Sequence, residues 1–559
     1  MSRGHHLPWA EYFATLQPHE RPQFPGSPAT PDHPAARRMA YAAVGVLVAI
    51  TGSLGNAVVT ANLPQLAGAL GATTAEAAWL PVVFVMTNAC MNLLLIKFRM
   101  QYGLQLFTRM ILGVFVLVSI GNLFISSFTS AIVLRAVAGM CAAGMSTLGF
   151  LYLIQAFPAA HRLKGLIIGI GLSSFALPLA RIFSSHLLDL DQWRAMHLFE
   201  LGMALASLAA VFALRLPPSE RLRAYDRLDF VTFALFAPGV AMLCAVLGLG
   251  RIVWWTEAAW IGWALAGSMI LLSAALIIEF NRKHPLINLH WMASGDIIRL
   301  VLAILLVRIV LSEQTSGAVG FLQQMGLGPD QMHGLFWVIL AAMIAGTLTS
   351  AFTLNVTKLN KPIAIALALI AVGAFIDSHA TVLTRPQNLF LTQSLLAFAS
   401  AFFIGPALLI GISQVMAKGA QNLVSFIVLF SIAQNVGGLA GGAIVGTVQT
   451  LREKFHSSQL TEAVNLGDPQ VVLRLQQLSG AYARVVVDPA ARNLEGMKLL
   501  SQQIAQQANV LAYNDVFLLI AAAAAAGSVW VTIVHLRPRI AARRAAAKEA
   551  AEAATDAAA

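Results

Sequence analysis

Residues 41–63 read YAAVGVLVAITGSLGNAVVTANL, a run of 23 residues without a charged side chain. A helix needs about 20 apolar residues to cross the hydrocarbon core of a bilayer, where its backbone must hydrogen-bond within its own segment. Thirteen further apolar stretches follow, so the sequence predicts an all-α integral membrane protein with fourteen transmembrane helices. The predicted spans are 41–63, 77–98, 104–125, 129–156, 165–187, 196–214, 229–250, 257–279, 298–321, 334–355, 362–380, 389–416, 421–450 and 513–536.

Composition and charge agree with this fold class. Of the 559 residues 58% are hydrophobic and 11% are charged, whereas about 25% of residues are charged in soluble domains. Lys and Arg concentrate in alternate short connectors, which by the positive-inside rule face the cytoplasm together with both termini. The sequence therefore predicts a multi-pass protein of the inner (plasma) membrane. The net charge of +11 is expected to face anionic lipid headgroups, so no nucleic-acid partner is predicted.

Breaks in the apolar pattern divide the chain into five parts. The expected parts are a flexible, Pro-rich cytoplasmic arm (1–38), a six-helix bundle (39–214), a cytoplasmic connector with two extra helices (215–296), a second six-helix bundle (297–536) and a cytoplasmic tail (537–559). The second bundle includes a long periplasmic loop, 451–512, whose last part is expected to be helical. Two bundles around a shared path are typical of secondary transporters.

No constellation of residues typical of catalysis is found in the sequence. A nucleophile elbow, a phosphate-binding glycine loop and a set of metal ligands are all missing, so the sequence predicts no enzyme, no cofactor and no metal site. Glycines four residues apart occur instead in GGLAGGAIVG (437–446), where they allow helices to approach closely. Packing is the expected role of these residues and a hinge for alternating access is the alternative; they are Gly437, Gly438, Gly441, Gly442 and Gly446.

Three ionisable residues are expected at a similar depth inside the membrane, where such groups are costly and commonly functional. They are Arg135, Arg181 and Glu200. One carboxylate cannot neutralise two guanidinium groups, so a positive charge is left to face the central path and would suit an anionic substrate. The alternative is an ion pair between Arg181 and Glu200, with Arg135 bound to backbone carbonyls. Asn56 and Arg308 are further candidates for the substrate pathway.

Glu313 is the preferred candidate for a carboxylate that exchanges protons during transport. Arg308 and Glu313 are five residues apart on one helix, which separates their directions by about 140° and prevents pairing between them. Burial of a carboxyl group brings its titration toward the working pH, as a proton-driven carrier requires. The alternative is a Glu313 that bonds to a neighbouring Ser or Gln, or lies near the outer interface. Glu200 and Asp377 are weaker candidates for proton coupling.

Several stretches together resemble a known family, the fourteen-helix drug:proton antiporter branch of the major facilitator superfamily (EmrB/QacA-like exporters). The resemblance extends over about 40–535. It implies the major facilitator fold and small-molecule export by proton antiport. Gram-negative members of the family work with a periplasmic adaptor and an outer-membrane channel, and loop 451–512 is the expected docking surface for such partners. The stretches are AVVTANLPQLAGALGAT (57–73), LRAVAGMCAAG (134–144), RKHPLINLHW (282–291) and QQANVLAYNDVF (506–517).

The chain departs from the family pattern at three places. The acidic residue of the family's first helix falls on Gly55, beside Asn56. The motif between helices 2 and 3 is reduced to KFRMQYGLQ (97–105), without its Asp. The helix 5 antiporter motif is absent, and its position holds Ala180 and Arg181. The resemblance therefore leaves the coupling site open and places an unexpected Arg on helix 5.

These observations predict an exporter of small amphipathic compounds or drugs, acidic or aromatic ones among them, that works by proton antiport and alternating access. Arg135 and Arg181 would orient an acidic group, and Glu313, or else Glu200, would exchange protons. An uncoupled anion facilitator or importer is the alternative within transport. A non-transporting membrane sensor or scaffold is the alternative from another class, although the tails are short and of low complexity.

Overall fold

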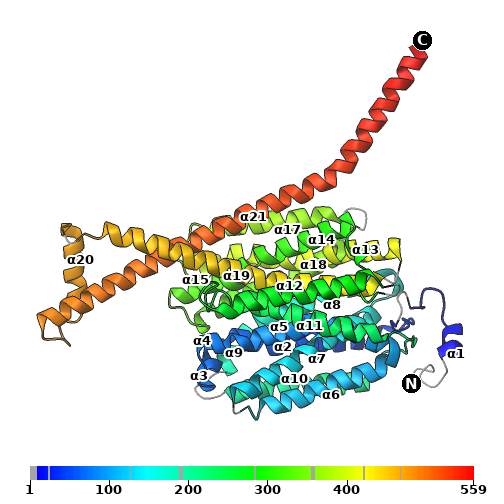
Figure 1. Ribbon diagram of the computed structural model, residues 1–559, viewed down its shortest axis with the longest axis horizontal. Helices are drawn as coiled ribbons and strands as arrows, with labels where there is room; N and C mark the ends of the chain where they lie inside the picture. The colour runs from blue at the N-terminus through cyan, green and yellow to red at the C-terminus, as the bar shows by residue number, and fades with distance from the viewer. Residues whose placement is uncertain are drawn as a thin grey trace.

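The computed structural model describes residues 9–22, 26–125, 127–187, 193–282, 285–353, 355, 359–419, 422–465 and 467–558. Side chains are described for these residues except 10, 184–187, 193 and 535–558. Within them the structure is helical, with no β-strand and one isolated bridge between Pro28 and Ser219 (Figure 1).

The helices follow one another with short connections. The first ten are α1 (Trp9–Ala14), α2 (Ala35–Ala61), α3 (Leu63–Ala69), α4 (Thr74–Ala77), α5 (Trp79–Tyr102), α6 (Leu104–Asn122), α7 (Phe128–Ala156), α8 (Arg162–Leu172), α9 (Ala176–Leu187) and α10 (Trp193–Ala213). The others are α11 (Arg227–Leu249), α12 (Ala259–Phe280), α13 (Leu289–Met292), α14 (Gly295–Val310), α15 (Val319–Gln324), α16 (His333–Thr353), α17 (Asn360–Asp377), α18 (Phe390–Lys418), α19 (Leu423–Ala463), α20 (Pro469–Gly480) and α21 (Pro489–Ala558).

Thirteen helical stretches in the described part of the chain are long and apolar enough to cross a membrane. The remaining predicted span, 298–321, is interrupted because a π-helical segment, η4 (Glu313–Ala318), separates α14 from α15. At about 1.5 Å per residue, α14, η4 and α15 together still have the length of a span. All fourteen predicted spans therefore overlap helical structure. Single-turn π-helical insertions often mark functional positions, and this one contains the candidate Glu313.

The helices form two sets that surround a central path. α2, α5 and α7 pack together in the N-terminal set, and α16, α17, α18 and α21 pack together in the C-terminal set. The sets meet where α5 contacts α19, and where α8 and α9 contact α16. The extra pair, α11 and α12, covers the first of these two seams, since α11 contacts both α5 and α19.

Large apolar side chains point outward over much of the surface. On α12, Trp263 is 79% exposed and Ile270 is 69% exposed, and the outer faces of α6, α16 and α17 are similarly apolar. A soluble protein rarely exposes an apolar surface of this extent, whereas lipid chains cover such a surface without penalty. The exposed faces therefore indicate a multi-pass membrane protein.

The two ends of the bundle differ. The hairpin face is the end from which α19 and α21 project together, with α20 between them (Figure 1). Loop 451–512 is thus largely helical, and its last part is the beginning of α21, as the sequence predicted. The arm face is the opposite end, where α1 and the end of α21 lie (Figure 1). The His456 ring and the Asp515 carboxylate, 2.7 Å apart, join α19 to α21 at the base of the projection.

Residues 26–34 lie against the arm face. Gln155 Nε2 donates a hydrogen bond of 2.8 Å to the carbonyl of Ala29, which is fully buried. The ring of His33 lies 3.2 Å from Gln155 Oε1, and burial lowers the pKa of His33. The sequence predicted a flexible arm, whereas these contacts hold its last part against α7. Residues 1–8 of that arm lie outside the described residues.

The glycines of α19 allow α14 to approach it closely. A side chain at Gly441 would overlap Ser312 Oγ and come within 2.9 Å of the Ile309 backbone, whereas one at Gly442 would meet only Ser316 Oγ at 3.6 Å. A side chain at Gly437 or Gly438 would crowd Arg308, and one at Gly446 would overlap Arg251.

Gly441→Ala is therefore expected to destabilise the protein by about 1–3 kcal/mol, since the added methyl group forces α14 and α19 apart. Gly442→Ala, one position along the same helix, is the matched control and should leave stability unchanged. Thermal unfolding of both purified variants in detergent measures the difference. Equal melting temperatures would show that the close approach at Gly441 does not stabilise the fold.

Candidate functional site

A cavity of about 1050 Å³ lies between the two sets of helices. α2, α5, α7, α8 and α9 line one side of it, and α14, α16, α18 and α19 line the other. It extends from Pro28 and Thr30 at the arm face to Thr60 and Leu63 near the far end of α2. Its apolar wall includes Phe84, Phe150, Phe336, Met343, Phe403, Met416, Phe426 and Phe430. Aromatic and sulfur-containing walls of this kind suit ligands with a lipophilic part.

Amide and hydroxyl groups line the cavity where α5 meets α19. Asn92 Nδ2 donates to Ser431 Oγ at 2.9 Å, and Asn435 Nδ2 donates to Asn88 Oδ1 at 3.3 Å. Each of these bonds joins the N-terminal set to the C-terminal set.

All charged side chains that line the cavity are arginines. They are Arg99, Arg162, Arg181 and Arg308, and no Asp or Glu of the described residues lines it. An arginine stays protonated in proteins, so the cavity wall carries positive charge without a matching negative one. Taking a cation out of water without a counterion is unfavourable, which is the reason such a wall attracts anions.

Arg181, on α9, is the most isolated of the sequence-predicted arginines. Its side chain is 8% exposed, and its Nε atom is buried without a hydrogen-bond partner among the described residues. The guanidinium carbon lies 5.2 Å from the centre of the Phe336 ring, a distance typical of a cation–π contact between the two sets of helices. Arg181 can therefore receive a carboxylate from the cavity while its ring contact holds it in place.

Arg308 and Asn56 also line the cavity, from opposite sides. Arg308 Nε donates to the carbonyl of Gln434 at 3.1 Å, beside the space that Gly437 and Gly438 leave open. Asn56 Oδ1 is buried without a hydrogen-bond partner in the described part of the chain. The two positions thus offer a guanidinium donor and an amide to a bound molecule.

Arg135 lies away from the cavity wall and pairs with Glu200. Arg135 Nη1 donates to the carbonyl of Gly55 at 3.0 Å, and Arg135 Nη2 lies 3.7 Å from Glu200 Oε2. Asn122 Nδ2 and His197 Nδ1 lie 3.4 and 3.5 Å from the same oxygen. Glu200 is therefore next to Arg135 and not Arg181, contrary to the ion pair considered from the sequence.

The carboxylate of Glu200 occupies the space beside Gly55. A side chain at position 55, where the resembled family has an acidic residue, would have to displace Glu200 Oε1. The sequence alone could not reveal this, because the two positions are 145 residues apart.

Arg135→Gln is expected to lower stability by about 3–5 kcal/mol, since it leaves the Glu200 carboxylate buried without its cation. The double variant with Glu200→Gln should recover much of this loss. The melting temperature in detergent is the measurement, with the exposed Arg109→Gln as the control. If the double variant were no more stable than Arg135→Gln, the ion pair would not be the reason for the loss.

Glu313 lies behind the cavity wall with Asp377 and Gln393. Gln393 Nε2 donates to both oxygens of Glu313, at 3.1 and 3.2 Å, and to Asp377 Oδ2 at 2.9 Å. All three side chains are buried, and the two carboxyl groups accept hydrogen bonds from the same amide nitrogen, Gln393 Nε2. No Lys or Arg of the described residues forms an ion pair with either. Two buried carboxyl groups in this arrangement are typical of a pair that shares a proton.

A single residue links this acidic pair to the cavity. Gln314 lines the cavity, and its Nε2 donates to the carbonyl of Gln393 at 3.0 Å. The π-helical turn η4 places Glu313 and Gln314 on different sides of the same helix, one toward α17 and α18 and the other toward the path. Asp377 is buried in this cluster. His379, two residues further along, lies outside it, and its Nδ1 atom is 3.0 Å from the carbonyl oxygen of Phe375.

Arg99 was missed as a candidate by the sequence reasoning, and Gln393 was considered only as one of several polar residues between the helices. Arg99 was counted only as part of a basic connector, yet it is 3% exposed and lines the cavity. Its spacing from Asn88 and Asn92, eleven and seven residues, places all three on one helical face and could have revealed it. Gln393 has no comparable signal, since its role depends on two acidic residues that other helices supply.

A buried charge network fixes the extra helices to the N-terminal set. Lys97 Nζ lies 2.6 Å from Asp229 Oδ2, and Arg282 lies 2.9 Å from Asp229 and 2.7 Å from Glu279. The network joins the ends of α5, α11 and α12. Because each acid faces at least one cation, this cluster is best explained as structural.

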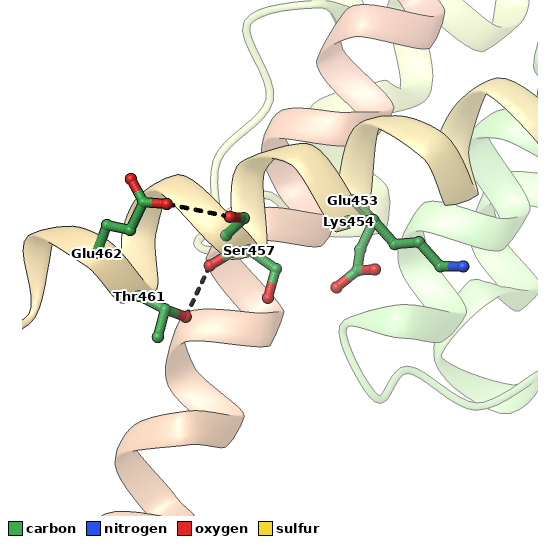
Figure 2. Close-up of a pocket in the computed structure, with 6 residues that line it drawn as sticks. Glu453, Lys454, Ser457, Thr461 and Glu462 are labelled. Carbon is green, nitrogen blue, oxygen red and sulfur yellow. Dashed lines mark hydrogen bonds between the residues drawn. The ribbon is translucent and has the colours of Figure 1, made fainter.

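A second, shallow pocket of about 440 Å³ lies on the projecting part of α19 (Figure 2). Its lining side chains all come from one helix, and two of its hydrogen bonds run from Ser458 to Glu462 and from Thr461 to the carbonyl of Ser457. Charges of both signs occur there, on Glu453, Lys454 and Glu462. The pocket lacks the enclosure of the central cavity, which is therefore the candidate substrate site.

The sequence matches no protein-family model. It is 25% identical over 246 residues to the major facilitator superfamily multidrug transporter mfsC of Aspergillus fumigatus. The match covers 43% of this chain and 46% of that relative, so the chain aligns with about half of the relative's length.

Solved structures show the same fold. The human organic anion transporter MFSD10 matches with a TM-score of 0.52 and 14% identity, over 88% of this chain and 100% of that one. The proton:xylose symporter XylE matches with a TM-score of 0.50 and 13% identity, over 88% of this chain and 95% of that one. At these identities the likeness establishes the fold and leaves the substrate open.

Proposed function

We propose that the chain, which has the fold of major facilitator superfamily transporters, exports small amphipathic acids across the inner membrane in exchange for protons. The observation that carries the proposal is the central cavity, which combines apolar walls with four arginines and has no acidic residue among its described lining. Such a wall favours a ligand with one lipophilic and one anionic end.

Arg181 and Arg308 are proposed to hold the anionic group of the substrate. Arg181 is buried in the cavity wall and Arg308 is partly buried there, one on each side of the path. The guanidinium group donates two parallel hydrogen bonds to a carboxylate, which gives direction as well as attraction. Phe336 and Phe403 supply apolar surface for the rest of the molecule. Asn56 adds an unpartnered amide oxygen to the same wall.

The pair formed by Glu313 and Asp377 is proposed to be the site of proton exchange. One proton shared between the two carboxyl groups relieves their repulsion, and its loss leaves a second negative charge that the buried site cannot hold at low energy. Gln393 and Gln314 would transmit this change to the cavity, since they connect the pair to its lining. Glu200, paired with Arg135, is the second candidate for coupling.

The orientation and the division into two six-helix bundles with two extra helices, both predicted from the sequence, remain part of the proposal. The arm face is proposed to be cytoplasmic, which puts both termini inside and loop 451–512 in the periplasm. Docking of a periplasmic adaptor and outer-membrane channel on that loop remains a proposal that the projecting α19, α20 and α21 support by their reach. The glycine contacts between α14 and α19 are compatible with packing and with a hinge between the bundles.

Inside-out membrane vesicles with an acidic lumen test the proposal. An aromatic carboxylic acid should accumulate in vesicles that contain the protein and not in vesicles that lack it, whereas a lipophilic cation should not accumulate. Passive weak acids collect on the alkaline side, so accumulation in the acidic lumen requires the transporter. Accumulation of the cation instead would replace acid export by ordinary multidrug antiport.

An uncoupled anion facilitator is the second candidate function. Two observations favour it: Glu313 does not line the cavity, and Gly55 stands where the resembled family has an acidic residue on its first helix. In that case the acid would equilibrate across the vesicle membrane with the protein present, and the imposed pH gradient would not change its final distribution beyond the passive level.

A further inference from the structure

Two arginines of the cavity, Arg99 and Arg162, are not used by the proposed substrate site, and only Arg99 lacks a hydrogen-bond partner for its whole guanidinium group among the described residues. Arg99 ends the cavity-facing stripe of α5, which also contains Pro81, Asn88 and Asn92. Its side chain is 3% exposed, and its Nε atom is buried without a hydrogen-bond partner. Among the described residues no carboxylate or carbonyl forms a hydrogen bond or an ion pair with its guanidinium group. A buried, permanently charged group that lines a cavity without a partner indicates a ligand.

Arg99 lies at the arm face end of the cavity. Its neighbour Met100 packs against Gly26 of the arm, and Pro28 and Thr30 of the arm line the cavity there. Arg162, which also lines this end, is held by the arm, since its Nη2 atom donates to the carbonyl of Thr30 at 2.6 Å. The two guanidinium groups therefore give the mouth of the cavity a positive charge of its own.

Two acidic residues of the arm, Glu20 and Asp32, act on Arg162 and not on Arg99. Glu20 accepts hydrogen bonds from the amides of Gln17 and Asp32, and the Asp32 carboxylate lies 3.2 Å from the ring of His19. Neither Glu20 nor Asp32 lines the cavity. Their charges thus serve the internal structure of the arm and partly balance Arg162, and neither pairs with Arg99.

The mouth is separate from the site around Arg181. Arg162 and Arg181 both line the cavity and lie at opposite ends of the span Ala159–Phe183. Nineteen residues separate them, or about 28 Å at 1.5 Å per residue. A small substrate cannot touch both ends at once, so an anion at the mouth would be a different bound state from an anion at Arg181.

We propose that Arg99 forms a second oxyanion site, which binds the carboxylate or phosphate group of an organic anion at the arm face before it reaches Arg181. The inference rests on the proposed function, whose path it extends. A soluble anion is favoured over a lipid headgroup, because Arg99 faces the cavity and α11 packs on α5 between that helix and the surroundings. Arg162 adds charge at the mouth while its guanidinium group stays bound to the arm.

Chemical modification of arginine by phenylglyoxal tests the proposal one residue at a time. The full chain is placed in nanodiscs of phosphatidylcholine, treated with the reagent with and without salicylate, and analysed by peptide mass spectrometry. Salicylate should slow modification of Arg99 by about tenfold, the effect of an interaction worth about 1.4 kcal/mol. Arg109, exposed on the neighbouring helix α6, is the control and should react equally in both samples.

The outcomes separate this inference from the proposed function. In Arg181→Gln, protection of Arg99 should persist, which shows an independent site. Protection of Arg181 without protection of Arg99 would overturn the second site and leave the proposed function standing. No reaction at Arg99 would also overturn it, since the residue would not be reachable from the path. Protection of Arg99 alone would support the mouth site and contradict the site at Arg181.

A final measurement identifies the source of the oxyanion. The modification is repeated in nanodiscs that contain phosphatidylglycerol, without salicylate. Unchanged reactivity of Arg99 supports a soluble anion as its ligand. If the anionic lipid alone protected Arg99 as salicylate does, the ligand would be a headgroup, and the assignment to a transported anion would be wrong.

Discussion

Glu313→Gln is expected to abolish accumulation of the acidic substrate against its gradient, with a fall of at least about tenfold to the level of vesicles without the protein. Glutamine keeps the shape and the hydrogen bonds of the side chain but cannot release a proton. Gln393 would then bridge Asp377 to a neutral partner, and the pair would no longer change charge during the cycle. Substrate exchange down a gradient should persist, since Glu313 does not line the cavity.

Both properties are measured in the same inside-out vesicles, first with an imposed pH gradient and then in counterflow without one. Glu257→Gln, on an exposed loop, is the control and should behave as the unaltered protein. Asp377→Asn should reproduce the loss of coupling if the two carboxyl groups act as a pair. Full gradient-driven accumulation by Glu313→Gln would exclude this proton site and favour either Glu200 or the uncoupled facilitator.

Arg181→Gln is expected to weaken binding of an aromatic carboxylate by roughly 10- to 150-fold, which corresponds to a charged hydrogen bond worth about 1.5–3 kcal/mol. The guanidinium group has no other partner than the Phe336 ring among the described residues, so its removal should leave the fold intact. Transport of a lipophilic cation, if any occurs, should not fall. Arg181→Lys should retain part of the affinity, because lysine keeps the charge and loses the planar pair of donors.

Initial rates over a range of substrate concentrations distinguish the expected result from a general loss of function. A raised KM for the acid with melting temperature unchanged would support a binding role. Arg109→Gln removes an exposed arginine and provides the control for net charge. If Arg181→Gln transported the acid with unchanged KM, Arg181 would be structural and the anion would have to bind elsewhere in the cavity.

The pairing of buried charges on different helices could not be determined from the sequence. Arg135, Arg181 and Glu200 were predicted at one depth, which left open which arginine meets the carboxylate. The structure pairs Arg135 with Glu200 and leaves Arg181 facing the cavity. The choice depends on the rotation of each helix about its axis, and one residue of error in counting changes that rotation by about 100°.

The acidic pair shows the same limit more strongly. Glu313 was found from the sequence because a carboxyl group in an apolar stretch is conspicuous. Asp377 was considered weaker because it stands at the predicted end of its span, and Gln393 was one of several polar residues. Only the packing of η4, α17 and α18 brings the three together.

The sequence by itself determined the number and position of the apolar spans, the all-α membrane fold and the approximate sites of buried charge. These are local properties, because lipid requires about 20 apolar residues and internal hydrogen bonds from every span regardless of its neighbours. The tertiary structure alone decided which charges neutralise one another, which face the path and where the arm rests. These depend on contacts between helices that are far apart in the chain, such as Gly55 with Glu200, and no local pattern encodes such contacts.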